Sequence, residues 1–131
     1  MKIFVGQKVT GENSEKLKKF SNKIIKALEK KGHSVYCNLF GKGIDERSPK
    51  EQMANAFREI DSSDIFLAII KNNKKSERMI MEIGYVIARG KRLIVAIKSK
   101  FKDSTYIPEM ANDVIIFESD RDLLNKLKEI K

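Results

Sequence analysis

Short apolar runs and amphipathic segments alternate along the whole chain. The apolar runs have the length and composition of β-strands, and they cover residues Lys2–Val5, Ser34–Leu39, Ile65–Ile70, Leu93–Ile97 and Val114–Phe117. The run Ile65–Ile70 is apolar throughout and bounded by polar residues, which is typical of a central strand covered on both faces. The pattern therefore predicts five strands, with the third at the centre of a sheet.

Apolar residues at helical spacing fill the intervals between these runs. The first predicted helix is capped by Asn13 or Ser14 and extends to about Lys31, with Gly32 at its end. The second starts at Ser48-Pro49-Lys50-Glu51, which combines an N-cap serine, a proline at the first helical position and a glutamate three residues after the cap. It runs to about Asp61 and is expected to bury three apolar residues, Met53, Phe57 and Ile60.

Two further helices follow by the same reasoning. Met79, Ile83, Val86 and Ile87 mark a third helix that Gly90 closes. Ser119 caps a last helix, whose inner side is expected to carry Leu123, Leu124, Leu127 and Ile130.

Strict alternation of strands and helices requires parallel pairing through right-handed crossovers. We therefore predict an α/β fold, a flavodoxin-like or Rossmann-like three-layer sandwich whose five-stranded parallel sheet has the order 2-1-3-4-5. The prediction treats residues 1–131 as one domain. In such sheets ligands bind beyond the carboxyl ends of the strands, at the switch point between strands 1 and 3. This directs attention to the loops Gly6–Asn13 and Lys71–Glu77.

Composition narrows the class of protein and of partner. The chain has 131 residues, of which 41% are hydrophobic and 34% charged, as in a folded globule. Its net charge of +9 comes from lysines scattered over helix faces, so we expect a solvated basic surface rather than a nucleic-acid site. No apolar run approaches the ~20 residues that a membrane helix needs. With no signal-peptide pattern at the N-terminus, the expected location is cytoplasmic and no membrane partner is predicted.

Cysteine and histidine exclude several kinds of site. Cys37 and His33 are the only residues of their types, so a disulfide framework, a cysteine-based or histidine-based metal site and a Ser–His triad are not expected. The prediction for metals is none.

The first loop has some features of a phosphate-binding turn. Gly6 and Gly11 allow the backbone to turn tightly, and the helix that follows presents unpaired N–H groups and a partial positive charge. Lys8 and Thr10 add donors, so we take Gly6, Gln7, Lys8, Thr10 and Gly11 as candidate substrate-binding residues. The loop lacks both the GxGxxG and the GxxxxGK[ST] spacing, so a plain strand-to-helix turn is an equal alternative.

The second segment, Ser76–Tyr85, carries the candidate catalytic group. Glu82 stands among apolar residues early in the third helix, one position before the inward-facing Ile83. Partial burial raises the pKa of a carboxyl group and a helix N-terminus lowers it, a combination that suits a nucleophile or an acid/base group. An exposed helix glutamate gives the same sequence pattern and remains an alternative.

The segment Ser76–Lys91 resembles the nucleoside 2-deoxyribosyltransferase family. Ser76 is followed six residues later by Glu82 and then by Ile83-Gly84-Tyr85, Ala88 and Gly90-Lys91. Ser63–Ala68 also resembles the family's stretch that ends in aspartate and a strand. The strand Ile3–Gly6 is similar to the start of the 2′-deoxynucleoside 5′-phosphate N-hydrolases, the nearest branch.

The resemblance implies roles for particular residues. Glu82 would attack C1′ of the sugar, expel the base and form a glycosyl ester that water or a second base resolves. Ser76 and the first loop would hold a 5′-phosphate, and Arg78 would bind phosphate where the family uses glycine backbone. No cofactor is implied. The family's members are dimers or larger, so we expect a homodimer in which the Lys98–Asn112 loop lies near the neighbour's site.

The chain departs from the family pattern at several of its helper positions. Arg78 and Ile80 stand where the hydrolases carry glycines, and Ile3 replaces the tyrosine of the first strand. The acid/base aspartate falls at Ala56, with Asn55 beside it. Loss of a general acid costs about 10²–10⁴ in rate.

We therefore expect a hydrolase or transferase acting on the N-glycosidic bond of a nucleoside 5′-monophosphate or nucleoside. Two alternatives stay open at this point. One is a non-catalytic nucleotide-binding or sensing domain that keeps the pocket without the acid/base partner, and the other is a TIR-like NAD glycohydrolase.

Overall fold

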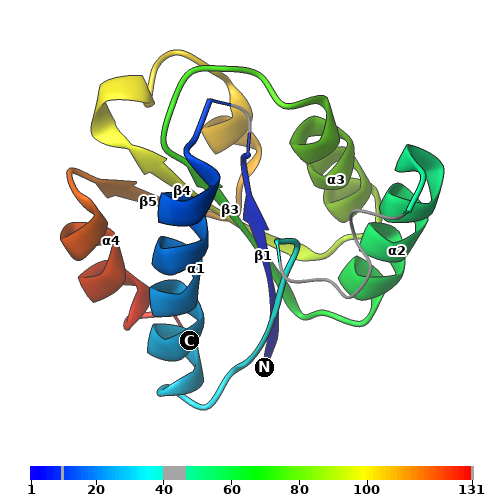
Figure 1. Ribbon diagram of the computed structural model, residues 1–131, viewed down its shortest axis with the longest axis horizontal. Coiled ribbons are helices and arrows are strands. Elements are labelled where there is room, and N and C mark those ends of the chain that lie inside the picture. The colour runs from blue at the N-terminus through cyan, green and yellow to red at the C-terminus, as the bar shows by residue number, and fades with distance from the viewer. Residues whose placement is uncertain (10, 40–46, 131) are drawn as a thin grey trace.

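Five parallel strands form the centre of the molecule. A computed structural model describes residues 1–9, 11–39 and 47–130. The strands pair side by side in the order β2-β1-β3-β4-β5, which confirms the predicted topology and fold class (Figure 1). Their bounds are β1 Lys2–Gln7, β2 Ser34–Cys37, β3 Ile65–Ile70, β4 Arg92–Lys98 and β5 Asp113–Phe117.

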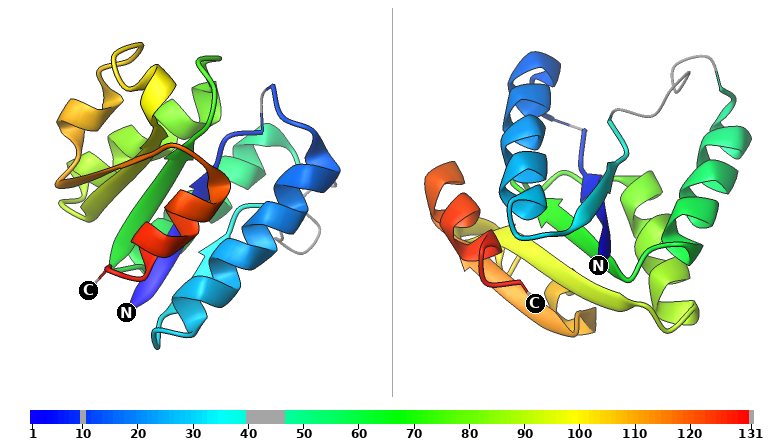
Figure 2. Two further views of the ribbon diagram at one scale, coloured as in Figure 1. Left: turned by 90° about the vertical axis from the view of Figure 1, so that its left-hand side faces the viewer. Right: turned by 90° about the horizontal axis from the view of Figure 1, so that it is seen from below.

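Helices cover both faces of this sheet (Figure 2). Their bounds are α1 Ser14–Glu29, α2 Pro49–Asp61, α3 Glu77–Ala88 and α4 Asp120–Leu127. α1 and α4 pack on one face, and α2 and α3 pack side by side on the other. Two short 3₁₀ helices that the sequence pattern did not indicate, Ser99–Phe101 and Ile107–Met110, lie between β4 and β5.

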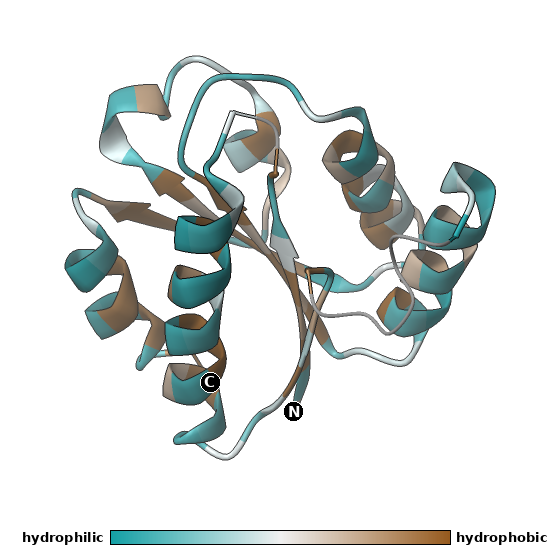
Figure 3. Cartoon of the chain, viewed as in Figure 1, coloured by the Kyte–Doolittle hydropathy of each residue, from teal (hydrophilic) through white to brown (hydrophobic). Residues whose placement is uncertain are grey.

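Alternate residues of each central strand belong to two separate hydrophobic cores, one on each face of the sheet. Ile3 and Val5 of β1 face α1 and α4, whereas Phe4 faces α2 and α3. Every residue of β3 is buried, because this strand has neighbours on both sides and helices on both faces. The brown strands and the teal outer turns of α1 in Figure 3 show the resulting separation of apolar interior from polar surface.

The element boundaries differ from the sequence prediction in a few places. β1 continues past Val5 to Gln7, because Gly6 and Gln7 pair with Ala68 and Ile69 of β3. β2 is shorter than predicted and ends at Cys37. The cap of α1 is Asn13, whose side chain accepts a hydrogen bond from the backbone N–H of Lys16.

The buried face of α2 also differs from the prediction. Ala56 and Ile60 are fully buried, whereas Met53 and Phe57 are only partly so. The Phe57 ring instead stacks on the ring of Tyr85 in α3, with centroids 4.3 Å apart. Residues on this side of α2 therefore pack against α3 rather than against the sheet.

Gly6 allows a close approach between β1 and β3. A Cβ atom on Gly6 would lie 2.7 Å from Cζ of Phe66, a ring that is 1% exposed and stacks on Phe4. The absence of a side chain at Gly6 is thus required by packing at the end of β1, next to the residues that lead into the first loop.

We predict that Gly6→Ala destabilises the fold by about 1–3 kcal/mol, the usual cost of overpacking a core. Urea unfolding measures the change. In a double-mutant cycle with Phe66→Leu, the two substitutions should cost less together than the sum of their separate costs, because the shorter side chain makes room for the methyl group. An unchanged unfolding midpoint in Gly6→Ala would contradict this explanation of the glycine.

Candidate active site

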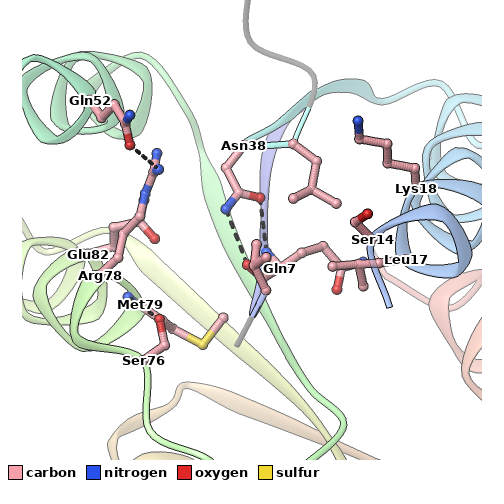
Figure 4. Close-up of a pocket in the computed structure, with 12 residues that line it drawn as sticks. Gln7, Ser14, Leu17, Lys18, Asn38, Gln52, Ser76, Arg78, Met79 and Glu82 are labelled. Carbon is pink, nitrogen blue, oxygen red and sulfur yellow. Dashed lines mark hydrogen bonds and ion pairs between the residues drawn. The ribbon is translucent and has the colours of Figure 1, made fainter. Parts of the chain in front are cut away.

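A cavity of about 400 Å³ opens at the carboxyl ends of the strands. Figure 4 shows residues of β1, α1 and the segment after β2 on one side of it, and residues of α2 and α3 on the other. Its polar lining includes Gln7, Asn38, Gln52, Ser76, Arg78 and Glu82. The cavity thus lies beside the predicted switch point and has the volume usual for a small-molecule site.

Glu82 lies on the inner face of α3 and points into this cavity from a buried position. Its side chain is 1% exposed, and Ser76, six residues earlier, caps the same helix by accepting a hydrogen bond from Met79 N at 3.3 Å. Glu82 Oε2 and Arg78 Nε form an ion pair 3.5 Å long. Within the described part of the chain, neither of these two buried atoms has a hydrogen-bond partner. Glu82 Oε2 therefore keeps an unused acceptor position beside the cavity.

Burial controls the protonation of this carboxylate. It raises the pKa of Glu82 to about 7, while the positive charge of Arg78 acts in the opposite direction. A pKa near neutrality means that the ionised and protonated forms are both accessible, as nucleophilic or acid/base chemistry requires.

Arg78 is held in place from α2. Its Nη1 donates to Oε1 of Gln52 at 3.1 Å, and Gln52 Nε2 in turn donates to the backbone carbonyl of Arg47 at 3.0 Å. The guanidinium group thus lies between Gln52 and Glu82 in the first turn of α3. A cation at a helix N-terminus is suited to an anionic ligand such as a phosphate.

Gln7 is joined to the end of β2 by a pair of hydrogen bonds. Its backbone N–H donates to Oδ1 of Asn38 at 3.1 Å, and Asn38 Nδ2 donates back to the Gln7 carbonyl at 3.2 Å. The Gln7 side chain donates from Nε2 to the hydroxyl of Ser21 at 3.1 Å. These contacts fix Gln7 in the cavity wall opposite α3.

Asn38 and Gln52 are cavity residues that sequence reasoning missed. Asn38 is 4% exposed and directly follows β2, and a polar residue at the carboxyl end of a strand beside the switch point is a usable signal. Gln52 lies one turn before Ala56 on α2, so its position on the inner side of that helix was available from helical spacing.

Among the described first-loop residues, Gly6, Lys8 and Gly11 do not line the cavity of Glu82. Lys8 is buried at 7% exposure, borders a separate cavity of about 150 Å³ and donates to the backbone carbonyl of Asn72 at 3.0 Å. Gly11 has φ +82°, and a Cβ there would lie 2.8 Å from Cδ of Lys74. These two residues therefore join the first loop to the β3–α3 loop. Thr10 lies outside the described residues.

The family pattern places an acid/base carboxyl group near Ala56. Among the described residues, the cavity lining contains no acidic side chain besides Glu82. Ala56 is 1% exposed in the core. The neighbouring Asn55 donates to the Tyr36 hydroxyl at 3.0 Å. Asp61 lies at the other end of α2, where it accepts hydrogen bonds from Tyr85 at 2.8 Å and from Arg89 at 3.0 Å. Residues 1–9, 11–39 and 47–130 also contain no group of three acidic, cysteine or histidine side chains placed to hold a metal.

Comparison with solved structures finds proteins of the same shape. The chain matches Clostridium botulinum CMP N-glycosidase BcmB with a TM-score of 0.75 and 26% identity over 97% of each chain. It matches a 2-deoxyribosyltransferase from Bacillus psychrosaccharolyticus with a TM-score of 0.67 and 19% identity, over 100% of this chain and 93% of that one. A 2-deoxyribosyltransferase from Leishmania mexicana matches with a TM-score of 0.71 and 12% identity over 99% of each chain.

No protein-family profile and no curated protein sequence matches the chain. The likeness to solved structures nevertheless extends over nearly the whole chain, and all three of these neighbours are enzymes. The predicted resemblance and the expectation of an enzyme are therefore confirmed. Among the described residues, no helix has the length and hydropathy to cross a membrane.

We predict that the buried Glu82 makes the fold less stable as the pH rises from about 4.5 to about 7. Because its pKa is raised from 4.5 to about 7, the folded state keeps in this window a proton that the unfolded chain releases. The contribution is complete below the unfolded pKa and is lost as the pH passes the folded one, with a total of roughly 3 kcal/mol.

Urea unfolding of wild type and Glu82→Gln at pH 4.5 and pH 8 measures this contribution. The neutral glutamine removes the titrating group, so the stability of the wild type should fall relative to the variant on going to pH 8. Parallel pH dependences of the two proteins would show that Glu82 has an ordinary pKa.

Proposed function

We propose that this nucleoside 2-deoxyribosyltransferase-like protein cleaves the N-glycosidic bond of a nucleoside 5′-monophosphate, with Glu82 as the nucleophile. The observation that carries the proposal is a buried carboxylate that faces a cavity of about 400 Å³, with a guanidinium group 3.5 Å from it. The likeness to a CMP N-glycosidase at 26% identity supports the type of bond and the class of substrate.

The reaction follows from the position of Glu82. In its ionised form, the carboxylate attacks C1′ of the sugar while the C1′–N bond breaks, and the bonding electron pair leaves with the base. This forms a glycosyl ester on Glu82. Water then attacks C1′, and the bond between C1′ and Glu82 breaks to return the carboxylate and release the sugar phosphate, as in retaining glycosidases. The proton that this water loses balances the negative charge of the departed base. A second base in place of water would make the same site a transferase.

The phosphate of the substrate would lie at the start of α3. The Ser76 hydroxyl, the Arg78 guanidinium and the N-terminal end of α3 lie on that side of the cavity, and a helix N-terminus favours a phosphate. Gln7 lies in the opposite wall, where it is placed to contact the remainder of the nucleotide. In this arrangement the phosphate binds to Arg78, whose positive charge also lowers the pKa of Glu82.

The proposed active form is a homodimer in which the Lys98–Asn112 loop of one copy lies near the site of the other. That segment contains Tyr106, which is 78% exposed, and Met110, which is 51% exposed. Exposed apolar side chains on a loop are typical of contact surfaces. The loop also borders the smaller cavity next to Ser76.

We predict base release from nucleoside 5′-monophosphates, and a fall in rate of roughly 10³-fold or more in Glu82→Ala, because the attacking group is removed. The assay is chromatographic detection of free base from a panel of ribo- and deoxynucleoside monophosphates, the matching nucleosides and NAD. Glu29→Gln is the control, since Glu29 is an exposed acidic residue at the far end of α1.

Three results of this assay contradict the proposal. Equal release by wild type and Glu82→Ala would exclude Glu82 as the nucleophile. Release from NAD alone would favour the TIR-like glycohydrolase. Saturable nucleotide binding with no base release from any compound would favour a nucleotide sensor.

We predict two effects of Arg78→Met, which keeps the length of the side chain and removes its charge. The kcat/KM for a nucleotide relative to its nucleoside should fall roughly 10- to 100-fold, because a charged hydrogen-bond donor to phosphate is lost. The apparent pKa of Glu82 in the pH–rate profile should rise, because the neighbouring positive charge no longer lowers it.

Arg121→Met is the matched control for charge, since Arg121 is exposed on α4, away from the cavity. A nucleotide preference that is the same in both variants would exclude Arg78 from phosphate binding.

A further inference from the structure

The two sides of the cavity differ in chemistry. The charged groups of Arg78 and Glu82 belong to α3 on one side (Figure 4). The opposite side receives apolar side chains from α1 and from the segment after β2, among them Leu17 and Leu39. A nucleotide with its phosphate and C1′ beside the charged groups therefore places its base, which is flat and uncharged, against this opposite wall.

Gln7 puts a buried amide group into the same wall. The residue is 3% exposed, and its Nε2 donates to Ser21 Oγ at 3.1 Å. Ser21 in turn donates to the backbone carbonyl of Leu17 at 2.8 Å. Because a carbonyl oxygen can only accept, the single hydroxyl hydrogen of Ser21 is used for Leu17, and its oxygen is left to accept from Gln7. The amide of Gln7 therefore has one favoured orientation, with Nε2 toward α1.

This orientation leaves Oε1 of Gln7 as an acceptor. In the described part of the chain, the hydrogen bonds of Gln7 involve its backbone N–H, its backbone carbonyl and Nε2. The fully buried side-chain atoms that lack a partner there belong to Arg78 and Glu82, so Oε1 of Gln7 is not sealed inside the protein. It therefore keeps unused acceptor positions beside the cavity that Gln7 lines.

The other polar groups of this wall do not change that preference. Asn38 uses its amide group for the two hydrogen bonds to the backbone of Gln7. Lys18 is exposed, and its Nζ lies apart from Gln7 (Figure 4). The hydroxyl of Ser14 can either donate or accept, so it does not discriminate between the two kinds of ligand group. The acceptor on Gln7 is thus the group in this wall with a fixed demand for a donor.

We propose that Gln7 selects nucleotides whose base carries an amino group where a related base carries a carbonyl group, that is, cytosine over uracil and adenine over hypoxanthine. The amino group donates to Oε1, whereas a carbonyl oxygen in its place would face a second acceptor and leave both unpaired. Ser21 is a positioning residue, because it holds the amide of Gln7 in this orientation. The inference rests on the proposed function and names the class of base that the site accepts.

Matched pairs of nucleotides test this selection. Cytidine and uridine 5′-monophosphate differ in carrying an amino or a carbonyl group at one ring position, and adenosine and inosine 5′-monophosphate differ in the same way. In each pair that the protein binds, wild-type kcat/KM should favour the amino member by about 10-fold or more, because the other member leaves buried polar groups unpaired. Calorimetric Kd values in the Glu82→Ala protein, where no turnover interferes, should show the same preference.

Two variants separate the acceptor from the residue that orients it. Gln7→Met has a side chain of similar length without Oε1, so the preference should nearly disappear through weaker binding of the amino member. Ser21→Ala keeps Gln7 and lets its amide turn to present Nε2 to a carbonyl group, so the preference should fall through better binding of the carbonyl member.

Ser63→Ala is the matched control for the loss of a buried hydroxyl group. Ser63 is also 3% exposed and also donates to a carbonyl four residues earlier, that of Glu59, at 2.6 Å. It lies just before β3, at the opposite end of that strand from the cavity, so its preference should equal that of wild type. Circular dichroism and thermal unfolding establish that all the variants are folded.

The outcomes separate base selection from the proposed reaction. Equal Kd values within each pair, or a preference that Gln7→Met retains, would overturn the selection by Gln7. A preference as strong in Ser21→Ala as in Ser63→Ala would overturn the positioning role of Ser21. Base release that depends on Glu82 without any preference within the pairs overturns this inference alone. The expected Kd ratios without base release from any compound overturn the reaction and support the selection.

Discussion

The burial of the Glu82 carboxylate beside Arg78 is the interaction on which the site depends. A buried charge is costly unless it is paired, and here a single ion pair of 3.5 Å offsets part of that cost. The remaining penalty appears as a pKa raised to about 7. A carboxylate in this state gains stabilisation from any ligand that offers positive charge to it, and the developing positive charge at C1′ of a sugar is such a partner.

The fold supplies the elements that hold this pair. α3 carries Arg78 and Glu82 on successive turns, and Ser76 is its N-cap. α2 contributes Gln52, which orients the guanidinium group, and β1 and β2 close the opposite wall through the paired hydrogen bonds of Gln7 and Asn38. The two walls come from opposite sides of the sheet's switch point. The distance between them therefore depends on the packing of both cores and not on any one loop.

The same helix also links the site to the surface. Its inner face is set by the core and by Glu82, and its outer face is apolar and centred on a glycine that no contact within the described chain requires. The packing of its inner face in the core limits how far α3 can shift, which suits a helix that carries a group aimed at a ligand.

The amino-acid sequence determined the strand order, three of the four helix caps as predicted, and the place of Glu82 near the start of an inward-facing helix. These features follow from hydrophobic periodicity, cap chemistry and the handedness of crossovers, which are all local or topological rules. Only the tertiary structure decided that Gln7 shares a cavity with Glu82 whereas Lys8 lies in another, and that Asn38 and Gln52 complete the walls. Side-chain direction at the end of a strand, and contacts between residues far apart in the chain, depend on how both faces of the sheet pack. The degree of burial that raises the pKa of Glu82 depends on the same packing.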